Sequence, residues 1–241
     1  MPGYSSEFPS RLTLGTTLMV RPYSYQVNDK VVGIDVSIVG AVLEKMGIEY
    51  TVIPAPYKRL IFLAQSGDID GIVAASTQIR KESKGALIFP EEPSYHSRMN
   101  IYGLNGAKAL GSVRELNGKR LGYPEGYILH SSIDTSQVTT ESFRNHISLL
   151  KALSKQRIHY FYGEEFPTRY ASKNLQLTKQ ITPVYNFSTL DFYPCFSRQS
   201  LGKLAPRFIA EFNRHLIELK HSGEVDKIIN QYLGPMKNTD G

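Results

Sequence analysis

Several residues with hydrogen-bonding side chains follow a short apolar run in the first half of the chain. The run covers residues 69–75, is bounded by turn residues, and is typical of a strand buried on both faces of a parallel sheet. Ser76, Thr77 and Arg80 come next. Ligands of open α/β sheets bind beyond the carboxyl ends of such strands, so Arg80 would offer its donors to a carboxylate or another anion. The alternative is an exposed arginine on an ordinary surface loop.

The second half of the chain carries polar residues in a similar place, after two further predicted strands. A short helix, a turn and a strand are predicted over residues 113–123, and Gly126 and Tyr127 follow them. The strand predicted over residues 157–162 ends just before Glu164. The rule about strand ends therefore selects Gly126, Tyr127 and Glu164 as candidate ligand contacts.

Strands and helices alternate in the elements that would position these residues. The apolar spacing predicts a helix from Asp35, as its N-cap, to Gly47, and a second helix that starts near Tyr57 and ends at Gly67. Such alternation is typical of a parallel sheet with helices on its faces. Further elements are predicted as strands or extended segments over 12–16, 48–53, 98–104 and 187–197, and as helices over 142–154, 204–219 and 224–233.

Composition narrows the class of protein. The 241 residues could make one large domain or two of common size. The net charge of +6 comes from cations scattered among acids, which argues against nucleic acid as a partner. Cys195 is the only cysteine, so neither an intrachain disulfide nor a cysteine cluster for zinc can form.

The sequence carries no familiar catalytic or metal-binding pattern. No run of about 18 apolar residues occurs that could span a membrane. The six histidines lack the paired spacing of metal ligands, and each is expected at the surface or satisfied in the interior. We therefore predict no catalytic residues, no metal and no cofactor.

Several short motifs, taken in order, resemble one known family. They are Tyr57-x-Arg59-Leu60, the run from Gln65 to Gly71, Thr77-x-x-Arg80, and Phe89-Pro90-x-x-Pro93-x-Tyr95. In this order and spacing they resemble the first lobe of the bacterial periplasmic solute-binding proteins, family 3, the polar amino-acid type.

The resemblance implies an α/β fold of two Rossmann-like lobes joined by a two-crossing hinge, the periplasmic binding protein type II fold. Lobe 1 would comprise residues 10–95 plus 196–235, and lobe 2 residues 96–195. In this family the C-terminal helices return to the first lobe, which implies hinges near 95–98 and 189–194.

The resemblance also implies roles for residues of the first lobe. Arg80 would hold the ligand's α-carboxylate, aided by Ser76 and Thr77. Tyr57 falls where the family places an aromatic wall, and Tyr23 lies in a loop where another aromatic often covers the ligand. Either tyrosine could instead belong to the core.

The second lobe departs from the family pattern. Gly126-Tyr127 stands where the family has glycine followed by serine or threonine, and Glu164 replaces the aspartate that accepts the ligand's ammonium group. Thr17 and Val20 stand where basic amino-acid binders carry a carboxylate and an aromatic residue. We therefore expect an anionic or zwitterionic small molecule, an amino acid or a derivative, rather than a standard L-amino acid in the usual pose.

The predicted function is capture of a small polar or carboxylate-bearing ligand in a cleft between the lobes, for import through an ABC-type membrane permease. We expect a periplasmic monomer that is not an enzyme. The residues after Met1 show no signal peptide, so the resemblance implies that an export signal was removed or that the chain was cut from a longer one.

Two alternatives remain open for this fold. One is the ligand-sensing domain of a receptor. The other is an enzyme similar to cyclohexadienyl dehydratase, in which Glu164 or Glu165 in a partly apolar cleft would be the general acid. Against the enzyme stands a carboxylate that merely pairs with a ligand cation or a neighbouring arginine.

Overall fold

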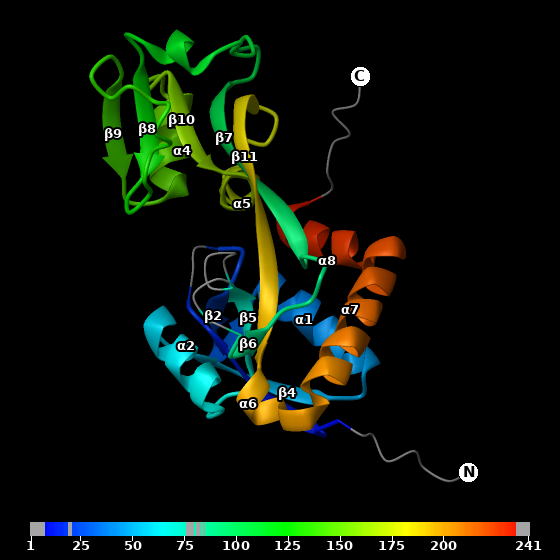
Figure 1. Cartoon of the computed structure of the whole chain (residues 1–241). Coiled ribbons are helices and arrows are strands. Elements are labelled where there is room, and N and C mark those ends of the chain that lie inside the picture. Colours follow the sequence, from blue (N-terminus) through cyan, green and yellow to red (C-terminus); the bar gives the residue numbers. More distant parts are fainter. Residues whose placement is uncertain (1–7, 19–20, 76–79, 81–82, 84, 235–241) are drawn as a thin grey trace. The chain divides into compact units, whose positions relative to one another are not determined.

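The computed structural model describes residues 8–18, 21–75, 80, 83 and 85–234, and it divides into two compact units (Figure 1). Unit 1 is formed by the chain up to residue 96 and from residue 191 onward, and unit 2 by residues 97–190. Two strands, β7 (Tyr95–Leu104) and β11 (Ile181–Ser197), run from one unit into the other. The chain therefore passes between the units twice.

Unit 1 is built on a parallel sheet. Strand β1 (Arg11–Thr16) lies between β4 (Glu49–Pro54) and β5 (Gly71–Ala75) and is parallel to both. The end of β11 pairs antiparallel with β5 and with the short strand β6 (Leu87–Ile88). A separate hairpin joins β2 (Tyr25–Val27) to β3 (Lys30–Val32). Its turn residues, Asn28 and Asp29, both have positive φ, which these residue types tolerate well.

Helices cover the sheet of unit 1. Helix α2 (Tyr57–Ser66) packs on β1 and β5 and against the short helix α6 (Arg198–Leu201). Helix α1 (Ile34–Lys45) packs against α7 (Ala205–His221) and α8 (Glu224–Leu233) (Figure 1). A 3₁₀ turn, η2 (Gly202–Leu204), precedes α7. The C-terminal helices thus belong to the core of unit 1, where Phe196 contacts the rings of Phe208 and Phe212.

Unit 2 repeats the α/β plan. Strand β8 (Arg120–Pro124) is parallel to both β9 (Thr139–Phe143) and β10 (Tyr160–Glu164), and β10 pairs antiparallel with β7. Helices α4 (His146–Ser154) and α5 (Glu165–Asn174) pack on each other and against β10. A 3₁₀ turn, η1 (Val113–Leu116), starts at a capping box formed by Ser112 and Glu115. The α/β fold class predicted from the sequence is confirmed.

Two local predictions were wrong, and two elements were missed. Residues 139–143 form strand β9, and the helix predicted from Ser142 begins only at His146, because Asn145 caps it. Helix α5 was not predicted at all. Asp35 is not an N-cap: α1 follows Gly33, whose φ is 138°, and a Cβ at Gly33 would lie 1.9 Å from the carbonyl oxygen of Tyr23.

Asp35 is instead a buried carboxylate that joins three segments of unit 1. Its side chain is almost fully enclosed, and it accepts a hydrogen bond of 2.9 Å from the Ser24 hydroxyl and another from the Tyr95 hydroxyl. Burial raises the pKa of Asp35 from 3.8 to about 6, although both hydrogen bonds act in the opposite direction. The carboxylate thereby ties α1 to the loop before β2 and to the first residue of β7.

Aromatic rings pack at the same place. The ring of Phe192, on β11, stacks on those of Tyr23 and Tyr95 at centroid distances of 5.0 and 4.8 Å. Just beyond, His96 Nδ1 lies 2.7 Å from a carboxylate oxygen of Asp191. Both strands that leave unit 1 are therefore anchored at their unit 1 ends by buried stacking and by polar contacts.

The raised pKa of Asp35 predicts a pH-dependent stability. Between 3.8 and about 6 the folded protein holds a proton on Asp35 that the unfolded chain has released. The free energy of unfolding therefore falls as pH rises through this window, on the order of 2–3 kcal/mol from this residue. The Asp35→Asn variant should lack this contribution to the pH dependence. Urea unfolding of the wild type and of the variant, from about pH 4 to about pH 7, measures the difference.

Glu92→Gln is the control, because Glu92 has the opposite shift. Its hydrogen bond of 2.8 Å with Lys220 lowers its pKa, so it favours the folded state more as pH rises. A pH dependence that is the same in the wild type and in Asp35→Asn would contradict the proposed effect of burial.

Candidate functional site

The carboxyl ends of the parallel strands in unit 1 meet at one edge of the sheet. Thr16 at the end of β1 lies opposite Pro54 at the end of β4, and the Ala55 N–H donates to the Thr16 carbonyl at 3.0 Å. Tyr57 begins helix α2 just after β4, and Arg80 follows β5. Two of the predicted ligand contacts, Ser76 and Thr77, lie outside the described residues.

Arg80 is exposed and its guanidinium lies over two aromatic rings. The distances from its central carbon to the ring centroids are 5.6 Å for Phe89 and 5.7 Å for Tyr193. Contacts of this kind are worth roughly 0.5–1 kcal/mol at exposed sites, and they restrict where the side chain points. Among the residues that the structure describes, no carboxylate pairs with Arg80. Arg80 is therefore a candidate contact for an anion.

The two tyrosines predicted for this lobe have different surroundings. Tyr57 is partly buried and packs against the apolar cluster that includes Leu60, Ala64 and Ile72. Tyr23 has no exposed surface and stacks with Phe192. The structure thus places Tyr57 at the strand-end edge and Tyr23 inside the core of unit 1, and their roles toward a ligand stay predictions.

In unit 2, Gly126 and Tyr127 form a tight turn after β8. Gly126 has a φ of 83°, and the Tyr127 N–H donates to the Pro124 carbonyl at 3.1 Å. This geometry requires a residue that tolerates left-handed backbone. The Glu125 N–H donates to the Phe143 carbonyl at 2.7 Å, which ties the turn to the end of β9. The turn is therefore fixed at the carboxyl edge of the sheet.

Glu164 lies at the same edge, as the last residue of β10 and the residue before α5. Burial raises the pKa of the Tyr127 hydroxyl, and the negative charge of Glu164 raises it further. Tyr127 therefore keeps its proton and can both donate and accept a hydrogen bond. The structure thus brings together the three residues of unit 2 that the sequence predicted.

The next residue, Glu165, has a different partner. Its carboxylate lies 3.4 Å from the Arg169 guanidinium, one turn further along α5. This is the pairing with a neighbouring arginine that the sequence left open against a general acid.

One residue of this edge was not predicted. His146, the first residue of α4, is 3% exposed, and neither ring nitrogen has a hydrogen-bond partner among the described residues. Its ring meets that of Tyr127 edge-on at a centroid distance of 5.8 Å, and a Cβ at Gly163 would lie 3.5 Å from its Nε2. Burial lowers the pKa of His146 to about 4, so the imidazole is neutral at neutral pH.

The environment of His146 contradicts our expectation that every histidine is at the surface or satisfied. A buried polar group without a partner costs about 1–3 kcal/mol. The spacing of Asn145 and Ser148, which form a reciprocal cap, could have marked this helix start in the sequence. Nothing in the sequence indicates that the imidazole would be unpaired, because that depends on its packing against Tyr127 and beside Gly163.

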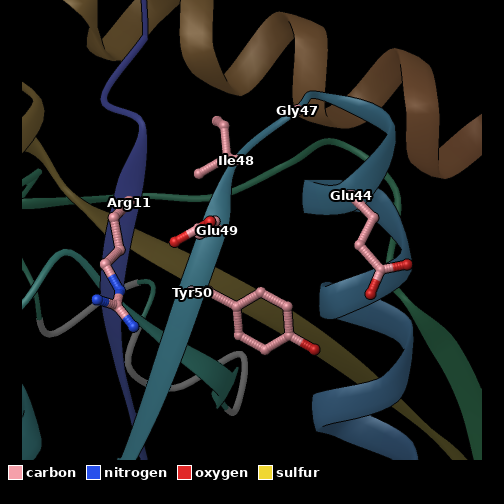
Figure 2. A pocket seen from close by; sticks show the side chains of 6 residues that line it. All are labelled: Arg11, Glu44, Gly47, Ile48, Glu49 and Tyr50. Carbon is pink, nitrogen blue, oxygen red and sulfur yellow. The ribbon is translucent and has the colours of Figure 1, made fainter.

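Figure 2 shows a hollow elsewhere in unit 1, of about 420 Å³. It is lined by residues that include Arg11 and Glu49, the first residues of β1 and β4, and Glu44 at the end of α1. The hollow thus lies at the amino ends of the strands, at the opposite edge from Arg80. It plays no part in the candidate site.

The described part of the chain contains neither a cluster of metal-ligating side chains nor a membrane-spanning helix. No group of three or more histidine, cysteine or acidic side chains is arranged there to hold a metal ion. Across the same residues, every helix is too short or too polar to cross a bilayer.

Comparison with known proteins agrees with the fold and with the resemblance. The chain is 23% identical to the arginine-binding extracellular protein ArtP of Bacillus subtilis (strain 168) over 92% of this chain and 86% of that protein. It is 25% identical to a probable histidine-binding protein of Campylobacter jejuni, over 95% of this chain and 88% of that protein. The unliganded, open L-cystine solute receptor of Neisseria gonorrhoeae has a similar fold, with a TM-score of 0.76, 17% identity and coverage of 93% and 92%.

The family comparison extends over almost the whole chain. The sequence pattern of one family matches residues 12–235, which include both units and every predicted contact residue. The chain belongs to the bacterial extracellular solute-binding proteins, family 3.

Proposed function

We propose that this protein captures an amino acid, or a closely related carboxylate, and delivers it to an ABC-type membrane permease. The observation that carries the proposal is the placement of complementary groups at strand ends: an available guanidinium in unit 1, and the Tyr127 and Glu164 edge in unit 2. Family membership and two relatives, an arginine-binding protein and a probable histidine-binding protein, support it.

The two units divide the ligand's polar groups between them in this proposal. Arg80, with Ser76 and Thr77, holds the carboxylate, since a guanidinium matches a carboxylate with two parallel hydrogen bonds. Glu164 accepts from the ammonium group, and the backbone at Gly126 holds the carboxylate or side chain from the other side. In this proposal, one lobe comprises residues 10–95 and 196–235, and the other comprises residues 96–195.

Closure of the lobes would be the output that the permease recognises. A ligand that contacts both lobes stabilises the closed state by its higher affinity for that state. Contacts with only one lobe would leave the balance between open and closed unchanged. We infer that the protein works as a periplasmic monomer without a cofactor and without turnover. The relatives, which are binding proteins rather than enzymes, support the last point.

A thermal-shift screen tests the proposed class of ligand. A ligand that binds only the folded state raises the melting temperature by mass action, by an amount that grows with its concentration over Kd. We expect at least one polar amino acid or derivative to raise the melting temperature. The matching amine without a carboxylate should have no effect, because Arg80 would lose its partner.

Isothermal titration should then give a Kd and one site per chain. Shifts only with carboxylates that lack an amino group would contradict the role of Glu164. No shift with any amino acid or small carboxylate would contradict the proposed function. Turnover of a cyclic carboxylate would favour the dehydratase function instead of the proposed one.

Arg80→Ala tests the anion-binding role directly. Loss of a charged, two-pronged contact should weaken binding at least about a hundredfold, since hydrogen bonds to charged groups contribute about 1.5–3 kcal/mol each. The melting temperature without ligand should change little, because Arg80 is exposed. Titration with the best ligand from the screen gives the affinity, and circular dichroism gives the stability.

Arg59→Ala is the matched control. Arg59 is also an exposed arginine of unit 1 whose guanidinium lies 5.6 Å from an aromatic centroid, that of Phe62. It should bind the ligand like the wild type. Wild-type affinity in Arg80→Ala would remove Arg80 from the site.

A further inference from the structure

His146 combines features that a purely structural residue does not need. Its side chain is buried, both nitrogens lack a partner in the part of the chain that the structure describes, and its ring lies close to Tyr127 and to Gly163, the residue before Glu164. Natural cores satisfy the great majority of their buried polar groups, so each exception requires an explanation. The imidazole is buried next to candidate ligand contacts, which suggests that its missing hydrogen-bond partner is the ligand.

We propose that the two nitrogens of His146 form a recognition point for the polar side chain of the bound amino acid. This inference rests on the proposed function and adds the chemistry of the side chain. A neutral imidazole has one N–H donor and one bare nitrogen acceptor. The complementary group both donates and accepts, as a carboxamide or a hydroxyl does.

In this proposal, a ligand would reach the imidazole past the ring of Tyr127. That ring meets the imidazole edge-on. Tyr127 itself is the last residue of a turn whose backbone is fixed by Gly126. A Cβ added at Gly163 would be in ordinary contact with Nε2 at 3.5 Å and with the Phe161 ring at 3.4 Å.

A site kept for a ligand costs stability in the absence of that ligand. Sites of this kind become more stable and less active when the polar group is replaced by an apolar one of similar shape. A structural histidine would show no such opposition. Stability and affinity, measured together, therefore separate a recognition role from a packing role.

His146→Phe is the test, because phenylalanine keeps a ring and removes both nitrogens. We expect a higher melting temperature without ligand and at least about tenfold weaker binding of the best polar amino acid from the screen. Binding of the aliphatic amino acid of similar size should be unchanged. Equal loss for both ligands, or no loss for either, would overturn the inference.

His159→Phe is the matched control in the same unit. His159 precedes β10, at the opposite edge of the sheet, and its Nδ1 accepts a hydrogen bond of 2.8 Å from the Arg120 N–H. Removal of this paired imidazole should not raise the melting temperature and should leave both affinities unchanged. A similar loss of affinity in this control would also overturn the inference.

Gly163→Ala keeps the test decisive if His146→Phe does not fold. The methyl group fits without a clash and lies against Nε2, so it should weaken binding of the polar ligand and leave the stability unchanged. Wild-type affinity would overturn the inference. If the wild type itself binds no amino acid, the proposed function fails, which is a different result from an unaffected variant of a protein that binds.

Discussion

Parallel pairing of strands is the constraint on which the candidate site depends. Because β1, β4 and β5 run in the same direction, the segments after them begin at one edge of unit 1, and this brings Tyr57 and Arg80 to that edge. The same pairing of β8, β9 and β10 brings Tyr127, His146 and Glu164 together in unit 2. Residues far apart in the sequence become neighbours because of strand direction, before any side-chain contact is considered.

Two buried polar side chains show how differently the fold uses similar environments. Asp35 is enclosed, but two hydroxyl groups donate to it, and the resulting contacts anchor the segments where the chain leaves and re-enters unit 1. His146 is enclosed to a similar degree and has no hydrogen-bond partner within the described ranges. Burial raises the pKa of Asp35 and lowers that of His146, and both shifts favour the neutral form of the side chain. The paired group contributes to architecture, and the unpaired one is available for recognition.

The sequence predicted the parts of this fold that local chemistry decides. The Gly67 cap of α2, helix α8 and the burial of β5 all follow from patterns within a few residues. Strand β9 was missed because its five residues are mostly exposed and carry no apolar alternation. The sequence placed Arg80 and Glu164 at strand ends, and their roles toward a ligand stay predictions, whereas the enclosure of Tyr23 and the unpaired state of His146 depend on distant segments. Tertiary packing sets such features, and local patterns do not contain them.

Hydrogen exchange with and without the identified ligand tests the central claim most directly, because it reports on both units in one experiment. Capture by both strand-end edges predicts slower exchange around Arg80 in unit 1 and around Tyr127 and Glu164 in unit 2 when the ligand is bound. Slower exchange in one unit alone, or around the hollow near Arg11, would contradict a ligand held by both.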